Sequence, residues 1–366
     1  MIKSLYACIF LLMLIGCGSG GKNNYENIEE NNEENTSFSP GLEAYYSEQW
    51  YLEENQTFYA INNIDENAHI HMSDILQHYS GRGVTVAIID DGLDVTHEEL
   101  KKTEMITYDV AEHTSDVSHD GLYDYHGTAV TGIIAADLNG KGIAGIANQS
   151  KIIFLKYHEE MSDSQVIEMF HKADELGADI INCSWGTYNV SPAVKETIQD
   201  LAINGRGGKG IIIVFAAGND DQEMGNDESA IPEVIAVGST DRDNLRAWYS
   251  NYGETLDIVA PGGYEVGIST LDPMGENGIA ELKSNYLLAN DPWSFIGTSA
   301  SAPIVSGVIA LLLEKYPELT REEIAELLKT SSDKIGNIEY IDDRNNYYGY
   351  GKINVKNLMN SIDTVK

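Results

Sequence analysis

"AIIDDGLD", Ala87 to Asp94, is the stretch of sequence that decides the fold. It completes the β-branched run "GVTVAIID" (83–90), which is typical of a strand buried on both faces of a parallel sheet. The run stops at two adjacent aspartates, Asp90 and Asp91. Because successive side chains of a strand point to opposite faces, we expect only Asp90 to face the site and Asp91 to point elsewhere.

Strand-like and helix-like segments alternate along the rest of the chain. Expected strands are 83–90, 150–157, 178–186, 210–219 and 233–240, and expected helices are 126–137, 161–177, 191–208 and 301–317. This alternation predicts an α/β fold with right-handed crossovers and three layers, in which helices cover both faces of a mostly parallel sheet. Functional sites in such folds lie at the carboxyl ends of strands, where Asp90 and Asn219 both fall.

Three polar residues in these segments suggest nucleophilic catalysis. A serine nucleophile needs a base within hydrogen-bond reach and a group that orients the base. Asp90 ends a strand, His126 in "DYHGTAVTG" precedes a helix, and Ser299 in "GTSASAPIVSG" begins another, with Pro303 expected in its first turn. The Ser299 N–H at the helix start, together with Asn219 in "AAGN", is expected to stabilise an oxyanion.

Each of these signals also has an ordinary structural explanation. Aspartates at strand ends are commonly turn residues, the chain has 9 histidines, and runs of small residues are frequent at helix starts. Their joint occurrence, each in its expected setting, predicts a serine-dependent hydrolase. The alternative from another functional class is an inactive protein of the same fold that binds substrates or inhibitors.

Eight motifs carry a resemblance to a known family. They are "VAIIDDGLDVTHEEL", "HGTAVTGIIAA", "GIAGIA", "NCSWG", "VFAAGN", "SNYGETLDIVAPGG", "GTSASAPIVSGVIALLLE" and "YGYGKINV". Together they resemble the subtilisin-like serine proteases, or subtilases, from about Glu43 to Val355, and the chain order Asp, His, Ser agrees. The Asp-Asp-Gly variant, "EQWYL" (48–52) and "GRGGKG" (205–210) are similar to the kexin and furin branch. The resemblance implies a seven-stranded, mostly parallel sheet and serine endopeptidase activity on protein or peptide substrates.

The resemblance also implies a role for each catalytic residue. Asp90 orients His126, which takes the proton of Ser299 and later returns it to the leaving amine, while Asn219 and the Ser299 N–H hold the oxyanion. The implied substrate-binding residues are Asp91, Asp227, Trp185 and Gly186. In kexin-like relatives the second aspartate favours a basic residue two positions before the cut.

The chain departs from that branch in three places. Kexin-like enzymes carry an acidic residue soon after "SWG", where this chain has Thr187, Tyr188 and Asn189, so we expect a looser preference for basic residues. They also continue into a β-rich domain, and most subtilases carry a folding propeptide for which 18–40 is too short. A maturase dedicated to one exported precursor is a second interpretation within the same class.

A calcium site follows from the resemblance as well. In "ADLNGKGIAG" Asn139 falls on a side-chain ligand position, and Lys141 and Ile143 fall on backbone-carbonyl positions. Glu99 and Glu43 fall where relatives carry ligand carboxylates. Oxygen-only ligands suit Ca²⁺, which would have a structural role. The alternative is an acidic surface without an ion.

The first 40 residues predict export and anchoring. Lys3 and the apolar stretch 6–15 are typical of a signal peptide, and "LIGC", ending at Cys17, resembles a bacterial lipobox. We therefore expect a lipoprotein signal (1–17), a disordered acidic tether (18–40) and a peptidase domain (41–366), with the protein held at a membrane of the cell envelope by lipid on Cys17. A plain secretory signal is the alternative.

Composition limits the partners. The 58 acidic and 23 basic residues give a net charge of −35, which disfavours nucleic acid and would attract a cationic substrate, although a solvated surface explains it as well. Cys183 has no disulfide partner in the mature chain, and we expect a monomer. "HIH" (69–71) lacks a third metal ligand and favours a surface or helix-entry role.

Overall fold

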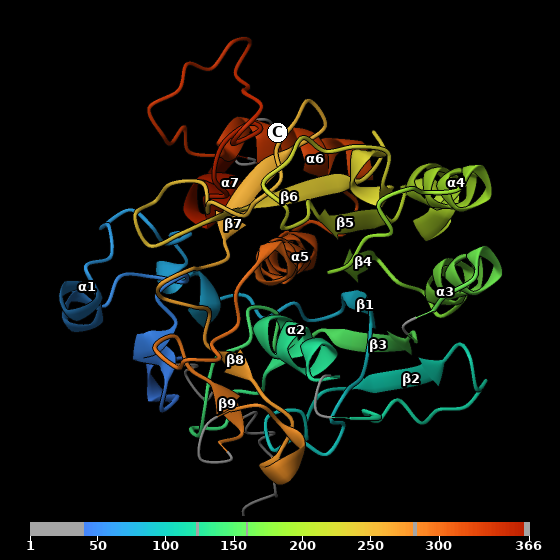
Figure 1. Ribbon diagram of the computed structural model, residues 1–366, viewed down its shortest axis with the longest axis horizontal. Helices are drawn as coiled ribbons and strands as arrows, with labels where there is room; N and C mark the ends of the chain where they lie inside the picture. The colour runs from blue at the N-terminus through green and yellow to red at the C-terminus, as the bar shows by residue number, and fades with distance from the viewer. Residues whose placement is uncertain (1–39, 122–123, 159, 281–283, 362–366) are drawn as a thin grey trace, which may run out of the picture. The chain divides into compact units, whose positions relative to one another are not determined.

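The computed structural model describes residues 40–121, 124–158, 160–280 and 284–361 (Figure 1). Its main element is a seven-stranded parallel sheet in the order β2-β3-β1-β4-β5-β6-β7. The strands are β1 (Thr85–Asp90), β2 (Met105–Asp109), β3 (Lys151–Lys156), β4 (Ile180–Cys183), β5 (Ile212–Ala216), β6 (Ile235–Thr240) and β7 (Ile258–Pro261), and a separate antiparallel pair is β8 (Thr270–Leu271) and β9 (Tyr286–Leu287). The α/β sheet expected from the sequence is confirmed.

Helices cover both faces of this sheet (Figure 1). They are α1 (Gln56–Asn62), α2 (His126–Ala135), α3 (Asp163–Glu175), α4 (Pro192–Gly208), α5 (Thr298–Lys315), α6 (Arg321–Ser331) and α7 (Val355–Ser361), with short 3-10 turns η1 (Pro40–Leu42), η2 (Tyr46–Glu48), η3 (Ser73–Gln77), η4 (Glu228–Ala230) and η5 (Gly275–Asn277). In β1, Val86 and Ile88 belong to the core shared with α2 and α5, whereas Ala87 and Ile89 belong to the core shared with α3 and α4. The strand is thus apolar on both faces, as its β-branched run predicts.

The longest helix, α5, passes through the core that it shares with α2. It is long and apolar enough to cross a membrane, but most of it is buried inside the protein, as in core helices of globular proteins. The prediction that Pro303 lies in the first turn is wrong, because α5 begins at Thr298 and Pro303 lies inside it. Pro303 cannot donate to the carbonyl four residues earlier, that of Ser299, which instead accepts the Ser184 hydroxyl at 3.0 Å.

The register brings the polar strand ends together. Asp90 ends β1, Ser184 follows β4, and Asn219 lies three residues after the end of β5, so all three lie at one edge of the sheet. Two helices, α2 and α5, begin at His126 and Thr298. Their N-termini carry unpaired N–H groups and a partial positive charge.

Candidate active site

Asp90 and His126 form a buried pair between β1 and α2. Asp90 is fully buried, and its Oδ1 lies 2.7 Å from His126 Nδ1 and accepts the Asp91 N–H at 2.9 Å. The other oxygen, Oδ2, is buried and has no hydrogen-bond partner among the described residues. Because Nδ1–H donates to the carboxylate, the neutral ring presents Nε2 as an acceptor on its partly exposed side.

The absence of a side chain at Gly127 allows Asp90 and His126 to approach each other. A Cβ at Gly127 would lie 2.4 Å from the Gly92 carbonyl oxygen and 3.1 Å from the Asp90 Cβ, which are prohibitive or tight distances. Glycine after His126 therefore lets α2 start directly against the end of β1.

The two aspartates control the charge of His126. Burial by itself would lower the pKa of His126, but the carboxylates of Asp90 and Asp91 outweigh it and raise that pKa to about 9. Burial, with the Asp90 charge, raises the pKa of Asp91. The imidazole therefore becomes neutral, and able to accept a proton, only as the pH rises toward that value.

The expectation that Asp91 points away from the catalytic pair is wrong. Its Oδ1 accepts the backbone N–H groups of Gly127 at 2.8 Å and Gly92 at 2.6 Å, and ligand atoms of Asp90, Asp91 and His126 lie within 4.8 Å of one another. The alternation rule fails because β1 ends at Asp90 and the chain bends at Asp91. The Asp91 carboxylate thus binds the N-terminus of α2, where negative charge is favourable.

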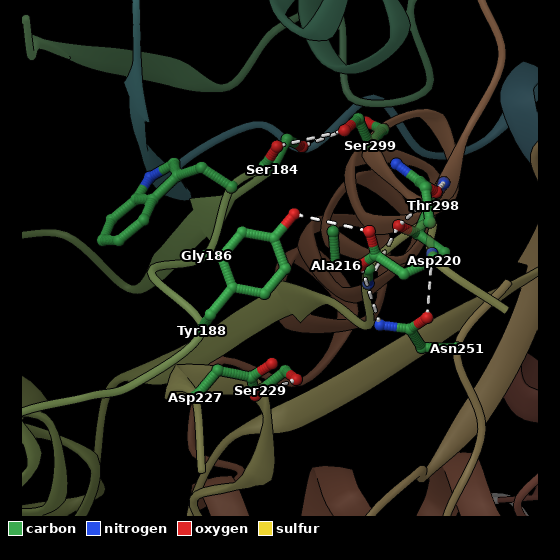
Figure 2. A pocket seen from close by; sticks show the side chains of 13 residues that line it. Ser184, Gly186, Tyr188, Ala216, Asp220, Asp227, Ser229, Asn251, Thr298 and Ser299 are labelled. Atoms are coloured by element: carbon green, nitrogen blue, oxygen red, sulfur yellow. Dashed lines mark hydrogen bonds between the residues drawn. The ribbon is translucent and has the colours of Figure 1, made fainter. Parts of the chain in front are cut away.

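Ser299 exchanges hydrogen bonds with Ser184 (Figure 2). The Ser299 hydroxyl donates to the Ser184 carbonyl at 3.0 Å, and the Ser184 hydroxyl donates to the Ser299 carbonyl at 3.0 Å. Within the described ranges, no hydrogen bond joins Ser299 to His126. Catalytic hydrogen bonds are often long or misaligned without substrate, and rotation about the Cα–Cβ bond would redirect the Ser299 hydroxyl.

Asn219 is held so that its amide nitrogen remains available. Its Oδ1 accepts both the backbone N–H and the hydroxyl of Thr298, each at 2.9 Å. These bonds assign Oδ1 and leave the Nδ2 donors for another acceptor. Ser299 is the second residue of α5, so its own N–H has no acceptor within the helix. Two donors therefore lie next to the Ser299 hydroxyl, the arrangement that an oxyanion site requires.

A cavity of about 150 Å³ opens beside Ser299 (Figure 2). Its lining residues come from the end of β5, from the segments that follow β4, β5 and β6, and from the start of α5: Ser184, Trp185, Gly186, Tyr188, Ala216, Gly218, Asn219, Asp220, Asp227, Ser229, Asn251, Thr298 and Ser299. Two carboxylates, those of Asp220 and Asp227, belong to this lining. The Trp185 indole is anchored by a 3.0 Å hydrogen bond from Nε1 to the Ile89 carbonyl.

A buried carboxylate supports one wall of this cavity. Glu228 is 1% exposed and accepts the Thr187 N–H at 3.0 Å and the Thr187 hydroxyl at 2.6 Å. Asn189, two residues after Thr187, is exposed and accepts the Asn226 side-chain amide at 3.0 Å. Through these two hydrogen bonds Glu228 holds Thr187, which lies between the lining residues Gly186 and Tyr188. Asn189 does not line the cavity.

The model of the subtilase family matches residues 81–351. The chain belongs to the subtilase family of serine peptidases. It is 33% identical over 338 residues to a calcium-dependent protease of Nostoc sp., covering 84% of this chain and 50% of that protein. It is 31% identical over 287 residues to subtilisin E of Bacillus subtilis, covering 76% of this chain and 66% of that protein.

Solved structures agree in fold. The serine protease of Aeromonas sobria superposes with a TM-score of 0.75 at 20% sequence identity, over 88% of this chain and 68% of that one. This subtilase spans about half the length of the first curated relatives that it matches, the calcium-dependent proteases of cyanobacteria.

The acidic residues expected to bind calcium gather beside the 139–145 loop of this subtilase. Glu43 is buried, and its carboxylate accepts the N–H groups of Gly140 at 2.8 Å and Lys141 at 2.9 Å. Glu99 is fully buried and accepts the Asn139 amide at 3.2 Å and the Tyr286 hydroxyl at 2.7 Å.

A buried oxygen without a hydrogen-bond partner at this loop is consistent with a bound cation. Asn139 Oδ1 is buried without a hydrogen-bond partner among the described residues. Burial raises the pKa of Glu99 to about 7, and the nearby carboxylates Glu43, Glu98 and Asp137 add to the rise. A cation would relieve both the orphan oxygen and the repulsion. The Lys141 ammonium pairs with Glu98 at 2.7 Å, and the apolar side chain of Ile143 is buried in the core. Neither side chain offers an oxygen, so these two residues could contribute only backbone carbonyls.

Sequence reasoning missed several residues of the site, and four of them form contacts that shape it: Ser184, Tyr188, Asp220 and Glu228. Asp220 directly follows Asn219 at a strand end, which is a signal that could have identified it. The other three have no such signal, because their roles depend on contacts with segments about 32 to 115 residues away along the chain.

Proposed function

We propose that this subtilase is a membrane-anchored, extracytoplasmic serine endopeptidase that favours a basic residue before the cut. The proposed catalytic activity rests on the 2.7 Å contact between Asp90 and His126 and on the orientation of the Asn219 amide, whose oxygen accepts the Thr298 N–H. A binding protein without activity would have no need to orient that amide.

The residues divide the reaction between them as follows. The Ser299 hydroxyl leaves the Ser184 carbonyl, gives its proton to His126 Nε2 and attacks the substrate carbonyl carbon. Asn219 Nδ2 and the Ser299 N–H donate to the oxygen that becomes negative. Asp90 stabilises the imidazolium, which then protonates the leaving amine. Water repeats the same steps and releases the acid product.

The acidic lining supports the preference for basic residues. Asp220 and Asp227 line the cavity beside Ser299, where the side chain before the cut would bind. Asp227 Oδ1 accepts the Ser229 hydroxyl at 2.7 Å, which holds the carboxylate in place. In kexin-like relatives the counterpart of Asp91 contacts the next residue back, and here Asp91 would serve both that residue and α2.

Calcium would complete the 139–145 loop. Glu43, Glu99 and Asn139 would hold it through side chains, and Lys141 and Ile143 through backbone carbonyls. The ion would supply positive charge among buried carboxylates and stabilise the fold. The curated relatives of Nostoc sp. and Trichormus variabilis are named calcium-dependent proteases, which supports this assignment.

Anchoring rests on the sequence alone, because Cys17 and the tether lie outside the described residues. Lipid on Cys17 would hold the enzyme at the cell envelope, and 18–40 would let the domain reach substrates away from the surface.

Labelling with a fluorophosphonate separates an enzyme from a binding protein. The parent should take the label and hydrolyse a mixed peptide library, and Ser299→Ala should lose both while keeping its melting temperature. Retention of more than a few per cent of hydrolysis by pure Ser299→Ala, or no label on a folded parent, would refute the proposal.

A further inference from the structure

Tyr188 is an exposed aromatic residue at the cavity beside Ser299. The residue is 69% exposed and lines that cavity. The hydroxyl donates to Asp220 Oδ1 at 3.4 Å, so the ring lies between the segment after β4 and the segment after β5 (Figure 2). The ring packs into no core, and its place suggests a role toward whatever enters the cavity.

The backbone at Tyr188 is held in an unfavourable conformation. Its φ is 62°, a left-handed value that costs a bulky residue about 1–3 kcal/mol. The flanking residues impose this value, because Glu228 binds Thr187 through two hydrogen bonds and Val190 N–H donates to the Asn226 carbonyl at 2.8 Å. The direction of the ring is thus set by a fixed wall.

The Asp220 carboxylate is weakly held by comparison. Its backbone N–H is fixed on Asn251 Oδ1 at 2.9 Å. Its carboxylate contacts are long, 3.4 Å to the Tyr188 hydroxyl and 3.5 Å to Asn251 Nδ2. An ammonium or guanidinium group forms shorter and stronger bonds to a carboxylate than a phenol does, so it would displace the Tyr188 hydroxyl at little cost.

We propose that Tyr188 is a specificity-determining residue that selects slender cationic side chains for the cavity, a proposal that rests on the peptidase function above. The ring narrows the entrance against broad aromatic side chains. The hydroxyl releases Asp220 to an incoming lysine or arginine, whose positive charge then faces Asp220 and Asp227 and contacts the ring face. A neutral side chain leaves the Tyr188–Asp220 hydrogen bond in place and gains neither the ion pair nor the ring contact, whereas a cation gains both after displacing that weak bond.

Peptides that differ only in the residue before the cut, Arg, Lys, Leu or Phe, test this role. Tyr188→Asn removes the ring with a residue that tolerates left-handed backbone, and Tyr188→Phe removes only the hydroxyl. Tyr188→Asn should raise the Phe-to-Arg ratio of kcat/KM about tenfold, equivalent to ~1.4 kcal/mol. Tyr188→Phe should raise kcat/KM for Arg over Leu two- to threefold, roughly the effect of one weak hydrogen bond. Tyr347→Asn removes an exposed tyrosine that does not line the cavity and should leave the ratios unchanged.

Specific outcomes overturn the proposal. A folded Tyr188→Asn whose Phe-to-Arg ratio stays within about twofold of the parent refutes the role of the ring. If that variant does not fold, an unchanged Arg-to-Leu ratio in Tyr188→Phe refutes the exchange with Asp220. A parent that takes the fluorophosphonate label and cleaves peptides with ratios insensitive to Tyr188 refutes this inference alone. A parent that neither labels nor cleaves refutes the peptidase function as well.

Discussion

At the scale of single residues, the two adjacent aspartates have different roles because their carboxylates bind different groups. Asp90 is fully buried and bonded to the His126 ring, whereas Asp91 binds the backbone at the start of α2. Both charges raise the pKa of His126, so each aspartate tunes the base as well as positioning it.

Asp91→Asn should separate these effects. Asparagine Oδ1 still accepts the Gly127 N–H, but the lost charge lowers the pKa of His126 from its raised value of about 9. A neutral imidazole is the active base, so the acidic limb of kcat/KM should move to lower pH. If Asp91 also contacts substrate, peptides with a basic residue two positions before the cut should lose about tenfold, ~1.4 kcal/mol. A limb that moves to higher pH would contradict the electrostatic role, and equal loss for all peptides would restrict Asp91 to support of the triad.

Asn219→Ala should reduce turnover far more than substrate binding. The Nδ2 donor interacts with an oxygen that is negative only along the reaction, and loss of one such donor costs about 10²–10³ in kcat. Steady-state kinetics on one good peptide measure the split. A change in KM alone would be inconsistent with an oxyanion role.

At the scale of elements, the start of α5 depends on a substitute hydrogen bond. Pro303 cannot donate to the Ser299 carbonyl, and the Ser184 hydroxyl from the end of β4 fills that position. The same hydroxyl accepts the Asn182 amide at 3.1 Å, so β4 and the nucleophile are joined through one side chain.

A double-mutant cycle tests this link. Ser184→Ala leaves the carbonyl unpaired and should lower the free energy of unfolding by about 1–3 kcal/mol. Pro303→Ala restores an N–H at the position that can donate to that carbonyl, so Ser184→Ala should cost about 1 kcal/mol less in this background. Denaturant titrations measure all four proteins. Strictly additive effects would show that the two positions do not share the Ser299 carbonyl.

At the scale of the whole molecule, a bound cation would link distant segments. Glu43 near the start of the described chain, Glu99 after β1 and Asn139 after α2 converge on one loop. Calcium at about 100 times its Kd would add ~2.7 kcal/mol of stability. The melting temperature should therefore fall by several degrees with chelator and recover with added Ca²⁺. Glu99→Gln should weaken this response, and Glu318→Gln, an exposed carboxylate on another surface, should not.

The proposed attachment of the protein to a membrane through Cys17 can be tested separately. Cys17→Ser should release the protein from the membrane fraction and remove the lipid-dependent shift in gel mobility. An unchanged distribution and mobility would show that the N-terminal segment is a plain secretory signal.

The sequence by itself determined the local features of this protein. Five of the seven strands of the parallel sheet contain short apolar runs, and β1, β3, β4, β5 and β6 were predicted from them. Asp90, His126, Asn219 and Ser299 were proposed as site residues because each lies at or shortly after the end of a strand or at the start of a helix. The strands β2 and β7, at the two edges of the sheet, were not predicted. β2 is mostly half-buried and forms no continuous apolar run, whereas the buried four-residue β7, as short as β4, was missed despite its apolar residues.

Tertiary structure alone decided how distant segments meet. The bend at Asp91 turned its carboxylate to α2, and Pro303 made the Ser299 carbonyl available to Ser184. The cavity is assembled from segments after β4, β5 and β6 and the start of α5, which meet only when these strands pair and α5 packs across them. Sequence patterns report the conformation of neighbours along the chain, whereas hydrogen-bond partners across a site depend on distances that only the packed sheet and helices set.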